Sequence, residues 1–366
     1  MRAPFFIRRP WLIVRGTLTN RDRPELAARH AINDPEEFVW AVLPHAARSF
    51  ATSILVLPRE EAWAAAIAYL QCRILDTYED LYPDGTRRPQ VLRSIGKRWL
   101  SRSAGPLEAI PPSVAVTDRD RVHLLLVERV ALIDAAYATL DAAARASIDE
   151  LVANMAEGMA WASETFAHQG GVLESRQQRA RYCHYVIGEP ALYAIRSLLH
   201  LPATDRRRSD ALEVSEMIQL ANITRDIERD LARGIAYHPA LRGDLGVAEP
   251  APPTTTARVR AVRETLLREA LTGVAAYARL VNDLPPGISQ ARGAAILMLA
   301  FTDRYYSGCA TRAELDGWSR PPRIAIYVNA ILGTLSARWA QRVVRRTTAN
   351  FNRFLAKPTR SAPPVG

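Results

Sequence analysis

The segment YLQCRILDTYED, residues 69–80, decides how the rest of the sequence is interpreted. Tyr69, Arg73, Asp76 and Asp80 follow one another at spacings of four, three and four, so in a helix they share one face. The small and apolar residues before them predict that this face is turned toward the core. Charged side chains in a core are costly unless they are paired or bind a metal. The segment therefore predicts a helix that carries chemistry on its inner side.

A second segment with the same character, QLANITRDIERD, occupies residues 219–230. It places Gln219, Asn222, Asp226 and Asp230 on one helical face. A single face of this kind is more simply an exposed row of ion pairs, whereas two of them predict a shared function. Mg²⁺ takes one or two protein carboxylates together with phosphate oxygens and water. If the two helices oppose each other, Asn222 and the four carboxylates could hold Mg²⁺ ions that make a diphosphate a good leaving group.

Most of the remaining sequence also predicts helices, because apolar residues recur every three or four positions and alternating strand patterns are scarce. The fold class predicted is all-α, with about nine helices. The sequence Pro83-Asp84-Gly85 ends one of them, residues 101–112 form a loop, and residues 249–256 form a surface connection. The candidate helices are residues 34–45, 59–82, 118–136, 138–166, 175–201, 208–233, 257–281, 287–307 and 321–354.

Composition narrows the possible partners and the compartment. The net charge is +10 and nearly all basic residues are arginine, which suits phosphate, anionic lipid or nucleic acid. No zinc-finger or RNA-binding motif and no compact basic block accompanies this charge, so we expect no nucleic-acid partner. The longest apolar run, from Gly293 to Thr302, is too short to span a membrane. The N-terminus resembles no secretory signal and the three cysteines show no paired spacing, which predicts a cytoplasmic protein.

The first 23 residues mix aromatic and aliphatic side chains with arginines. This pattern admits two interpretations, namely peripheral contact with an anionic membrane surface or an extension packed on the body of the protein. Pro4 and Pro10 argue against a regular amphipathic helix. After Lys357 the sequence is rich in proline and predicts a frayed tail.

The two acidic motifs and the segments around them resemble the squalene/phytoene synthase family of trans-prenyltransferases. The resemblance extends from Pro44 to Pro239 and, more weakly, to about residue 340. It implies the isoprenoid synthase fold, which is a single-domain helical bundle around a central apolar cavity, here residues 31–355. Residues 1–30 are then an N-terminal extension and residues 356–366 a disordered tail.

The resemblance also implies roles for individual residues. The metal-binding residues it implies are Asp76, Asp80, Asn222, Asp226 and Asp230. The diphosphate-binding residues it implies are Arg48, Ser49, Arg73, Gln219 and Arg225. Phe50, Tyr69 and Tyr182 are the residues expected to serve the cationic intermediates, and Val186 and Gly188 those expected to shape the cavity.

Two departures from the family pattern concern the substrate and the product. Glu189-Pro190 follows Gly188 where the family has apolar residues and a further glycine. Ile235 follows Gly234 where squalene and phytoene synthases usually carry an arginine, and Arg233 is the nearest substitute.

The resemblance therefore implies condensation of two prenyl diphosphates with Mg²⁺ or Mn²⁺, either farnesyl diphosphate to squalene or geranylgeranyl diphosphate to phytoene. Squalene would require NADPH, phytoene requires proton loss, and water capture would give a hydroxylated product. The sequence leaves these endings open, and the lack of a GxGxxG motif does not decide among them. Two alternatives remain, namely prenyl transfer to a different acceptor and a non-catalytic assembly factor.

Overall fold

The computed structural model describes residues 9–13, 24–47, 49–103, 105–247, 250–315 and 321–357. Within these ranges the chain is built of helices and contains no strand, which confirms the predicted all-α class. The only extended pairing described is an isolated parallel bridge between Val172 and Ala236. In the same residues no helix is both long enough and apolar enough to cross a membrane.

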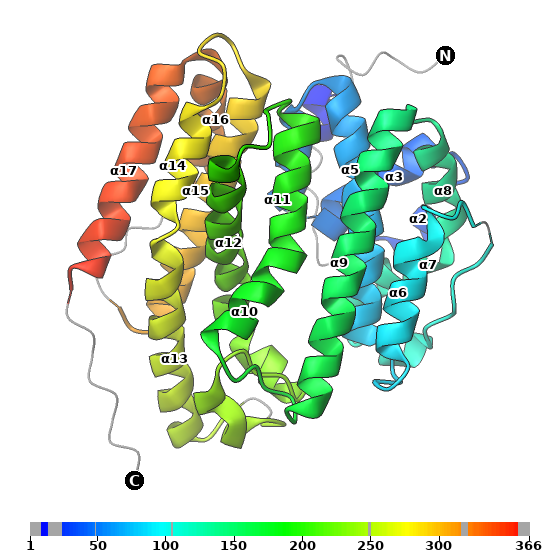
Figure 1. The fold of residues 1–366 in the computed structure, drawn as a ribbon, viewed down its shortest axis with the longest axis horizontal. Helices are drawn as coiled ribbons and strands as arrows, with labels where there is room; N and C mark the ends of the chain where they lie inside the picture. The colour runs from blue at the N-terminus through cyan, green and yellow to red at the C-terminus, as the bar shows by residue number, and fades with distance from the viewer. Residues whose placement is uncertain are drawn as a thin grey trace. The chain divides into compact units, whose positions relative to one another are not determined.

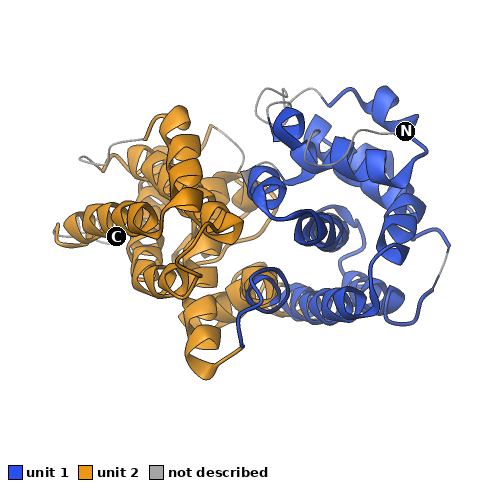
Figure 2. Ribbon diagram, turned by 90° about the horizontal axis from the view of Figure 1, so that it is seen from above, with its two compact units in different colours: residues 1–163, 193–202 blue, residues 164–192, 203–366 orange. Residues whose placement is uncertain are grey.

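The chain divides into two compact units, which are described in turn (Figure 2). Unit 1 contains residues 1–163 and 193–202, and unit 2 contains residues 164–192 and 203–366. The first acidic motif, residues 69–80, lies in unit 1, and the second, residues 219–230, lies in unit 2. Two of the three boundaries lie inside helical segments, one within helix α9, Ala142–His168, and one within α11, Glu189–Tyr193, whereas the boundary between Pro202 and Ala203 lies in a loop.

Unit 1 is organised around α5, Arg59–Leu81, which packs on α3, α4, α6, α7 and α8 (Figure 1). Ile67, Leu70, Ile74, Leu75 and Tyr78 of this helix are fully buried. The helix ends at Leu81, before Pro83, as predicted. The helices around it are α2 Leu26–His30, α3 Pro35–Ala47, α4 Ser49–Val56, α6 Arg88–Arg98, η1 Pro112–Val114, α7 Asp118–Glu128, α8 Val130–Ala138 and η3 Ala194–Leu198.

Residues 9–13 form a helical turn that packs on the body of unit 1. The Arg9 guanidinium donates from Nε to the Leu55 carbonyl at 2.6 Å and from Nη2 to the Val56 carbonyl at 2.8 Å. These carbonyls lie at the end of α4, where helical carbonyls lack partners within the helix. Leu12 of the same turn is buried. This turn therefore fits the packed interpretation of the N-terminus, while residues 1–8, 14–23 and the predicted tail at 358–366 lie outside the described residues.

Unit 2 is organised around α12, Asp205–Ala232, which packs on α10, η2, α13, α14 and α15. The outer helices α14 and α15 in turn contact α17 (Figure 1). The helices of this unit are α10 Arg176–Cys183, η2 His184–Gly188, α11 Glu189–Tyr193, η4 Pro239–Asp244, α13 Pro253–Leu271, α14 Val274–Asn282, α15 Gln290–Arg312, α16 Arg323–Leu335 and α17 Ala337–Leu355.

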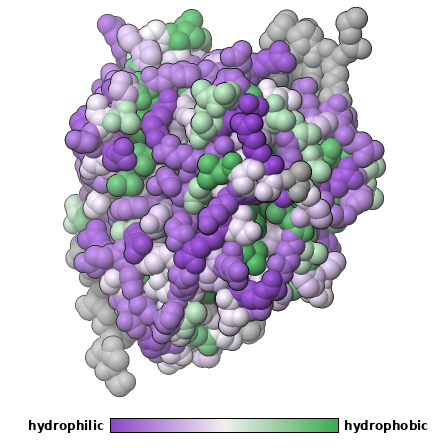
Figure 3. Space-filling view, turned by 45° about the vertical axis from the view of Figure 1, so that its right-hand side comes forward, coloured by the Kyte–Doolittle hydropathy of each residue, from purple (hydrophilic) through white to green (hydrophobic). Residues whose placement is uncertain are grey.

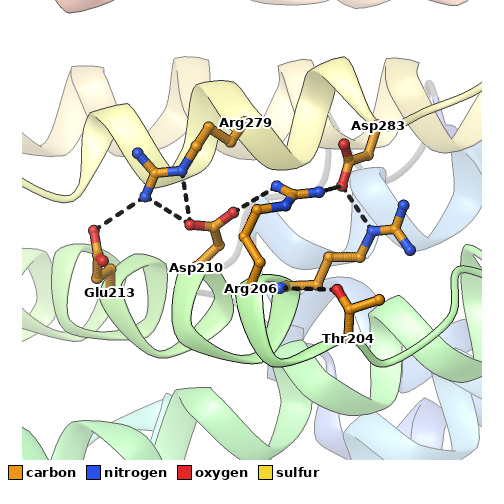
Figure 4. Close-up of polar contacts among 7 residues, drawn as sticks. Thr204, Arg206, Asp210, Glu213, Arg279 and Asp283 are labelled. Atoms are coloured by element: carbon orange, nitrogen blue, oxygen red, sulfur yellow. Dashed lines mark hydrogen bonds and ion pairs between the residues drawn. The ribbon is translucent and has the colours of Figure 1, made fainter.

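Two charge networks, each with a buried member, hold α12 in place. At its beginning, the Asp210 carboxylate accepts hydrogen bonds from Arg206 at 2.9 Å and from Arg279 of α14 at 2.8 and 2.6 Å (Figure 4). Farther along, the buried Arg263 of α13 donates to the Thr224 carbonyl at 2.8 Å and to the Glu228 carboxylate at 2.7 and 2.6 Å. Both ends of the helix are thereby tied to the helices that cover it.

Several predicted helices differ from the structure in where they break. The predicted helices 118–136, 257–281 and 321–354 are each two helices, interrupted near Arg129, Gly273 and Ser336. Ser336 has an extended backbone and its Oγ accepts from the Trp339 amide at 3.3 Å, so it caps α17 as α16 ends. Helices α2, α4 and α6 are absent from the prediction, and residues 253–256, predicted as a connection, begin α13.

Candidate active site

The first acidic motif lies on α5, the central helix of unit 1. Arg73 Nη2 donates to the Tyr69 hydroxyl at 2.6 Å, and Arg73 Nη1 contacts Asp76 Oδ2 at 2.8 Å. The guanidinium also lies over the Tyr69 ring, 5.4 Å from its centroid. Three of the predicted residues are thus in direct contact along one side of the helix. Asp80 continues this side toward solvent.

Burial along this side of α5 is mixed. Thr77, one turn after Arg73, is fully buried, whereas Arg73 and Asp76 keep 16% and 19% of their side-chain surface exposed and Asp80 is exposed. The expected core face is therefore buried in part and opens to solvent at Asp80. A functional side that remains partly open is better suited to receive a polar ligand than a sealed core would be.

The Asp76 carboxyl is electrostatically poised for a cation. Burial raises its pKa, Arg73 opposes the increase, Asp80 adds to it, and Arg119 of α7 opposes it. The net direction is upward, which means that this carboxylate is destabilised as an anion despite its ion pair. A divalent cation would relieve that cost. Arg119 is a neighbour of the motif that the sequence pattern did not reveal, because it lies on another helix.

The N-terminal part of the predicted site is described only in part. The Phe50 ring packs on the Tyr69 ring with a centroid separation of 5.8 Å, so the structure brings these two predicted aromatic residues together. Arg48 lies outside the described residues. The backbone of Ser49 begins α4, and its side chain is outside the description.

The second acidic motif lies on α12, the central helix of unit 2. Arg225 donates to both oxygens of the adjacent Asp226 at 2.8 and 2.6 Å, and Arg229 lies 3.7 Å from the same carboxylate. The Arg225 guanidinium also lies 5.3 Å from the Tyr305 ring centroid. Asn222 Nδ2 donates to Gln219 Oε1 at 3.1 Å. The predicted residues are therefore paired with one another along one helix.

Asp230, the last carboxylate of the motif, lies at a small pocket of unit 2. The pocket wall near it includes Ile235, Tyr237 and His238. Gly234 makes the turn that follows α12, with φ of 76°, a conformation that favours glycine. The Ile235 amide then donates to the Asp230 carbonyl at 2.9 Å. Ile235, which stands where the family usually has an arginine, contributes an apolar wall here.

An aromatic cluster surrounds the predicted Tyr182. Its ring lies 5.2 Å from that of Tyr237, whose hydroxyl donates to the Tyr182 hydroxyl at 3.3 Å. Phe166 packs edge-on against Tyr237 at 5.5 Å. Tyr237 is held by the backbone bonds that Ala236 makes with Gly171 and Leu173, at 2.8 and 2.9 Å. Tyr237 and Phe166 were not predicted from the sequence, because only the fold brings these distant segments to Tyr182.

The segment after Tyr182 turns as a π-helix, η2, a geometry frequent at functional sites. Val186 and Gly188 of this segment are buried. A Cβ added to Gly188 would lie 3.1 Å from Leu212 Cδ2 and 3.4 Å from Ser215 Oγ, so this glycine allows close packing on α12. His184 hydrogen-bonds Glu216 at 3.0 Å.

The two motifs differ in how they fit a metal. In the part of the chain that the structure describes, no three His, Cys, Asp or Glu side chains gather into a metal site. Mg²⁺ needs no such group, since one or two carboxylates suffice when phosphate oxygens and water complete its shell. The Asp76 and Asp80 pair fits that requirement, and its oxygen donors suit Mg²⁺ or Mn²⁺. On α12, Asp226 would meet the same requirement if Arg225 released its carboxylate and bound another anion.

Comparison with known proteins identifies a family and similar solved structures. A family model described as squalene/phytoene synthase matches residues 43–318. The solved complex of TcSQS with the ligand BPH1237 is similar with a TM-score of 0.69 at 18% sequence identity, covering 90% of this chain and 94% of that chain. The TcSQS complex with E5700 is similar with a TM-score of 0.67, with the same identity and coverage. No curated protein gives a match.

At this identity the structural likeness establishes the fold, which is the all-α isoprenoid synthase fold of the squalene synthase structures. The family model covers most of the chain and includes both acidic motifs and the Tyr182 segment. The chain therefore belongs to the squalene/phytoene synthase family and is a prenyltransferase.

Proposed function

We propose that this enzyme ionises a prenyl diphosphate with the help of Mg²⁺ and joins it head to head to a second prenyl diphosphate, releasing diphosphate. Membership of the family supports the head-to-head condensation. The observation that carries the metal-dependent step is the partly buried Asp76 carboxyl, whose pKa is raised by burial and which lies in a row with Arg73 and Asp80. Such a row offers both a cation site and a phosphate contact.

The residues that would hold Mg²⁺ are Asp76, Asp80, Asn222, Asp226 and Asp230, with Mn²⁺ as a substitute of the same ligand preference. When bound, the cation would neutralise the diphosphate and make it a better leaving group.

Arginines of both motifs would bind the diphosphate. Arg73 and Arg225 are each held beside a carboxylate at 2.6–2.8 Å, so their guanidinium groups are already positioned. A guanidinium contacts phosphate oxygens through two parallel hydrogen bonds, which fixes the orientation of the substrate. Gln219 would add an amide donor on the same face of α12. We assign Arg48 and Ser49 to the same role on the resemblance alone.

Aromatic rings would stabilise the allylic cation after ionisation. Phe50 and Tyr69 form one pair of rings, and Tyr182 with Tyr237 forms another. The face of an aromatic ring attracts a cation, most strongly where water is excluded. We include Tyr237 in this role because its ring and hydroxyl both contact Tyr182.

Two substrates fit the proposal. Farnesyl diphosphate would give presqualene diphosphate and then, with NADPH, squalene. Geranylgeranyl diphosphate would give phytoene.

A second candidate function keeps the ionisation but transfers the prenyl group to a non-prenyl acceptor. The apolar Ile235 beside Asp230, together with Glu189-Pro190, motivates it. A non-catalytic assembly factor is the third, and the intact carboxylates of both motifs argue against it.

The deciding experiment is incubation of the purified protein and Mg²⁺ with farnesyl or geranylgeranyl diphosphate, with and without NADPH, followed by mass spectrometry of extracted products. A C30 or C40 hydrocarbon, or its cyclopropyl diphosphate precursor, is the expected result. Folded protein that consumes neither substrate alone, but does so when an amine or aromatic acceptor is added, would support the second candidate.

The metal assignment is tested by Asp80→Asn. We expect turnover to fall on the order of 100-fold or more, since charge stabilisation at the leaving group is lost, with the circular dichroism spectrum unchanged because Asp80 is exposed. The matched control is Glu79→Gln, which removes the adjacent carboxylate from a different side of α5 and should leave turnover within a few-fold. Equal activity of the two variants would remove Asp80 from the site.

A further inference from the structure

An exposed apolar stripe runs along α16 in unit 2. Ile324, Val328, Ile331 and Leu335 are 70%, 43%, 60% and 57% exposed, and their spacings of four, three and four place them on one side of the helix. Single exposed apolar residues are normal on a protein surface. On the face drawn in Figure 3, hydrophobic residues are scattered among hydrophilic ones in this way. A continuous aliphatic row on one helix is different and marks an interaction surface.

The other side of α16 already provides the contacts that the core needs. Ile326, Ala330 and Gly333 are buried, and a Cβ added to Gly333 would lie 3.1 Å from Ile296 of α15. The Ser289 amide donates to the Thr334 carbonyl at 2.9 Å, which places the exposed Ile288 at the end of the same helix. The stripe is therefore additional to the packing of unit 2.

The next helix, α17, carries a basic face. Arg338, Arg342, Arg345 and Arg346 are all exposed, and no acidic side chain among the described residues pairs with them. From Pro321 to the last residue the sequence contains no Asp or Glu. Several arginines elsewhere on the surface do have carboxylate partners, such as Arg93 with Glu157 at 2.9 Å. The positive charge of α17 is thus left for an external anion.

The two helices are neighbours within unit 2, and each carries its exposed row on the side opposite its buried residues. They are joined at Ser336 and pack on each other, with Trp339 Nε1 donating to Asn329 Oδ1 at 3.1 Å. We define the α16–α17 face as the stripe Ile324, Val328, Ile331 and Leu335 together with the row Arg338, Arg342, Arg345 and Arg346.

We propose that the α16–α17 face docks on the surface of an anionic lipid bilayer. Aliphatic side chains on one helix would enter the boundary between headgroups and acyl chains, while the arginines bind lipid phosphates. The stripe has no polar side chain that could orient a protein partner, whereas a bilayer requires no directional contact. Helix α16 has 13 residues, too few to cross the hydrocarbon core, so the contact is interfacial. This proposal does not depend on the proposed reaction.

The test is co-sedimentation of the full-length protein with vesicles of phosphatidylcholine alone or mixed with phosphatidylglycerol. We expect binding to the mixed vesicles that weakens as salt is added. Replacing all four arginines of the face by glutamine should lower the partition coefficient on the order of 100-fold or more, at roughly fivefold for each arginine. Ile331→Ser with Leu335→Ser should lower it at least about tenfold.

Each variant has a matched control. For the arginines it is glutamine at Arg87, Arg93, Arg121 and Arg196, four unit 1 arginines that lie beside carboxylates and give the same change of net charge. For the stripe it is Leu100→Ser with Val116→Ser, two other exposed apolar residues. Both controls should bind vesicles like the unchanged protein.

Several outcomes would overturn the proposal: no binding to mixed vesicles, or the same loss of binding in the test and control variants. Sedimentation velocity without vesicles could give a further outcome that overturns it. If the unchanged protein is a dimer and the variant with Ile331→Ser and Leu335→Ser is a monomer, the face binds a second copy of the chain. If the serine variant unfolds, the glutamine variant decides, since all four of its positions are exposed.

Discussion

Replacing Asp210 by asparagine should destabilise unit 2 by about 2 kcal/mol. The carboxylate is 1% exposed and accepts three hydrogen bonds, from Arg206 at 2.9 Å and from Arg279 at 2.8 and 2.6 Å (Figure 4). Breaking a fully buried ion pair typically costs about 3–5 kcal/mol. Here Arg206 and Arg279 are 47% and 45% exposed, so water can solvate them when the carboxylate is lost. The expected cost is reduced accordingly.

The assay is thermal unfolding followed by far-ultraviolet circular dichroism, in which about 2 kcal/mol corresponds to a decrease in Tm of about 4–8 °C for a unit of this size. The control is Glu213→Gln, one turn later on α12. Its carboxylate is 49% exposed and lies 3.6 Å from Arg279, so its removal should change stability by less than about 0.5 kcal/mol. If Asp210→Asn and Glu213→Gln gave the same Tm, burial of the Asp210 carboxylate would not be the source of the stabilisation.

Three further predictions follow from particular contacts. Gly171→Ala should destabilise by about 1–3 kcal/mol in urea unfolding, since φ is 88° and the added Cβ would lie 2.2 Å from the Gly234 carbonyl oxygen, whereas Gly243→Ala, with open space, should be neutral. Tyr237→Phe should lower kcat by about two- to tenfold through loss of its hydrogen bond to Tyr182, with an unchanged melting curve. Hydrogen bonds from Arg258 hold the pKa of the buried Asp244 below its ordinary value, so its contribution to stability is present above about pH 4 and disappears as the pH falls through the folded-state pKa. Titrating Tm between pH 3 and 6 should show a shallower acid dependence in Asp244→Asn than in the unchanged protein.

The sequence predicts that α5 and α12 are helices because many residues in each repeat the same apolar spacing. The sequence does not predict where a helix is interrupted, because each interruption depends on one or two residues. Ser336 fits a helix interior by composition and acts as a cap only because α17 turns back on α16. Helix α6 was missed because its apolar side, with Val91, Leu92 and Ile95, is short and follows a turn sequence.

The same limit applies to the candidate site. Spacings of three and four residues predict contacts along one helix, and the structure has them between Tyr69, Arg73 and Asp76. Contacts between helices have no such signal in one sequence. Arg119 beside Asp76 and Tyr237 beside Tyr182 depend on helix packing and on the Val172–Ala236 bridge.

Both acidic motifs share a feature, namely an arginine that neutralises the first carboxylate of its motif. Arg73 pairs with Asp76, and Arg225 pairs with Asp226. Carboxylates with 19% exposure would be costly to hold as bare anions, and an adjacent guanidinium reduces that cost. In the proposed reaction, metal-bound substrate would offer a cation to the carboxylate and an anion to the arginine. Each pair could then open without leaving either charge alone, which would allow the proposed metal ligands to be stable before the metal binds.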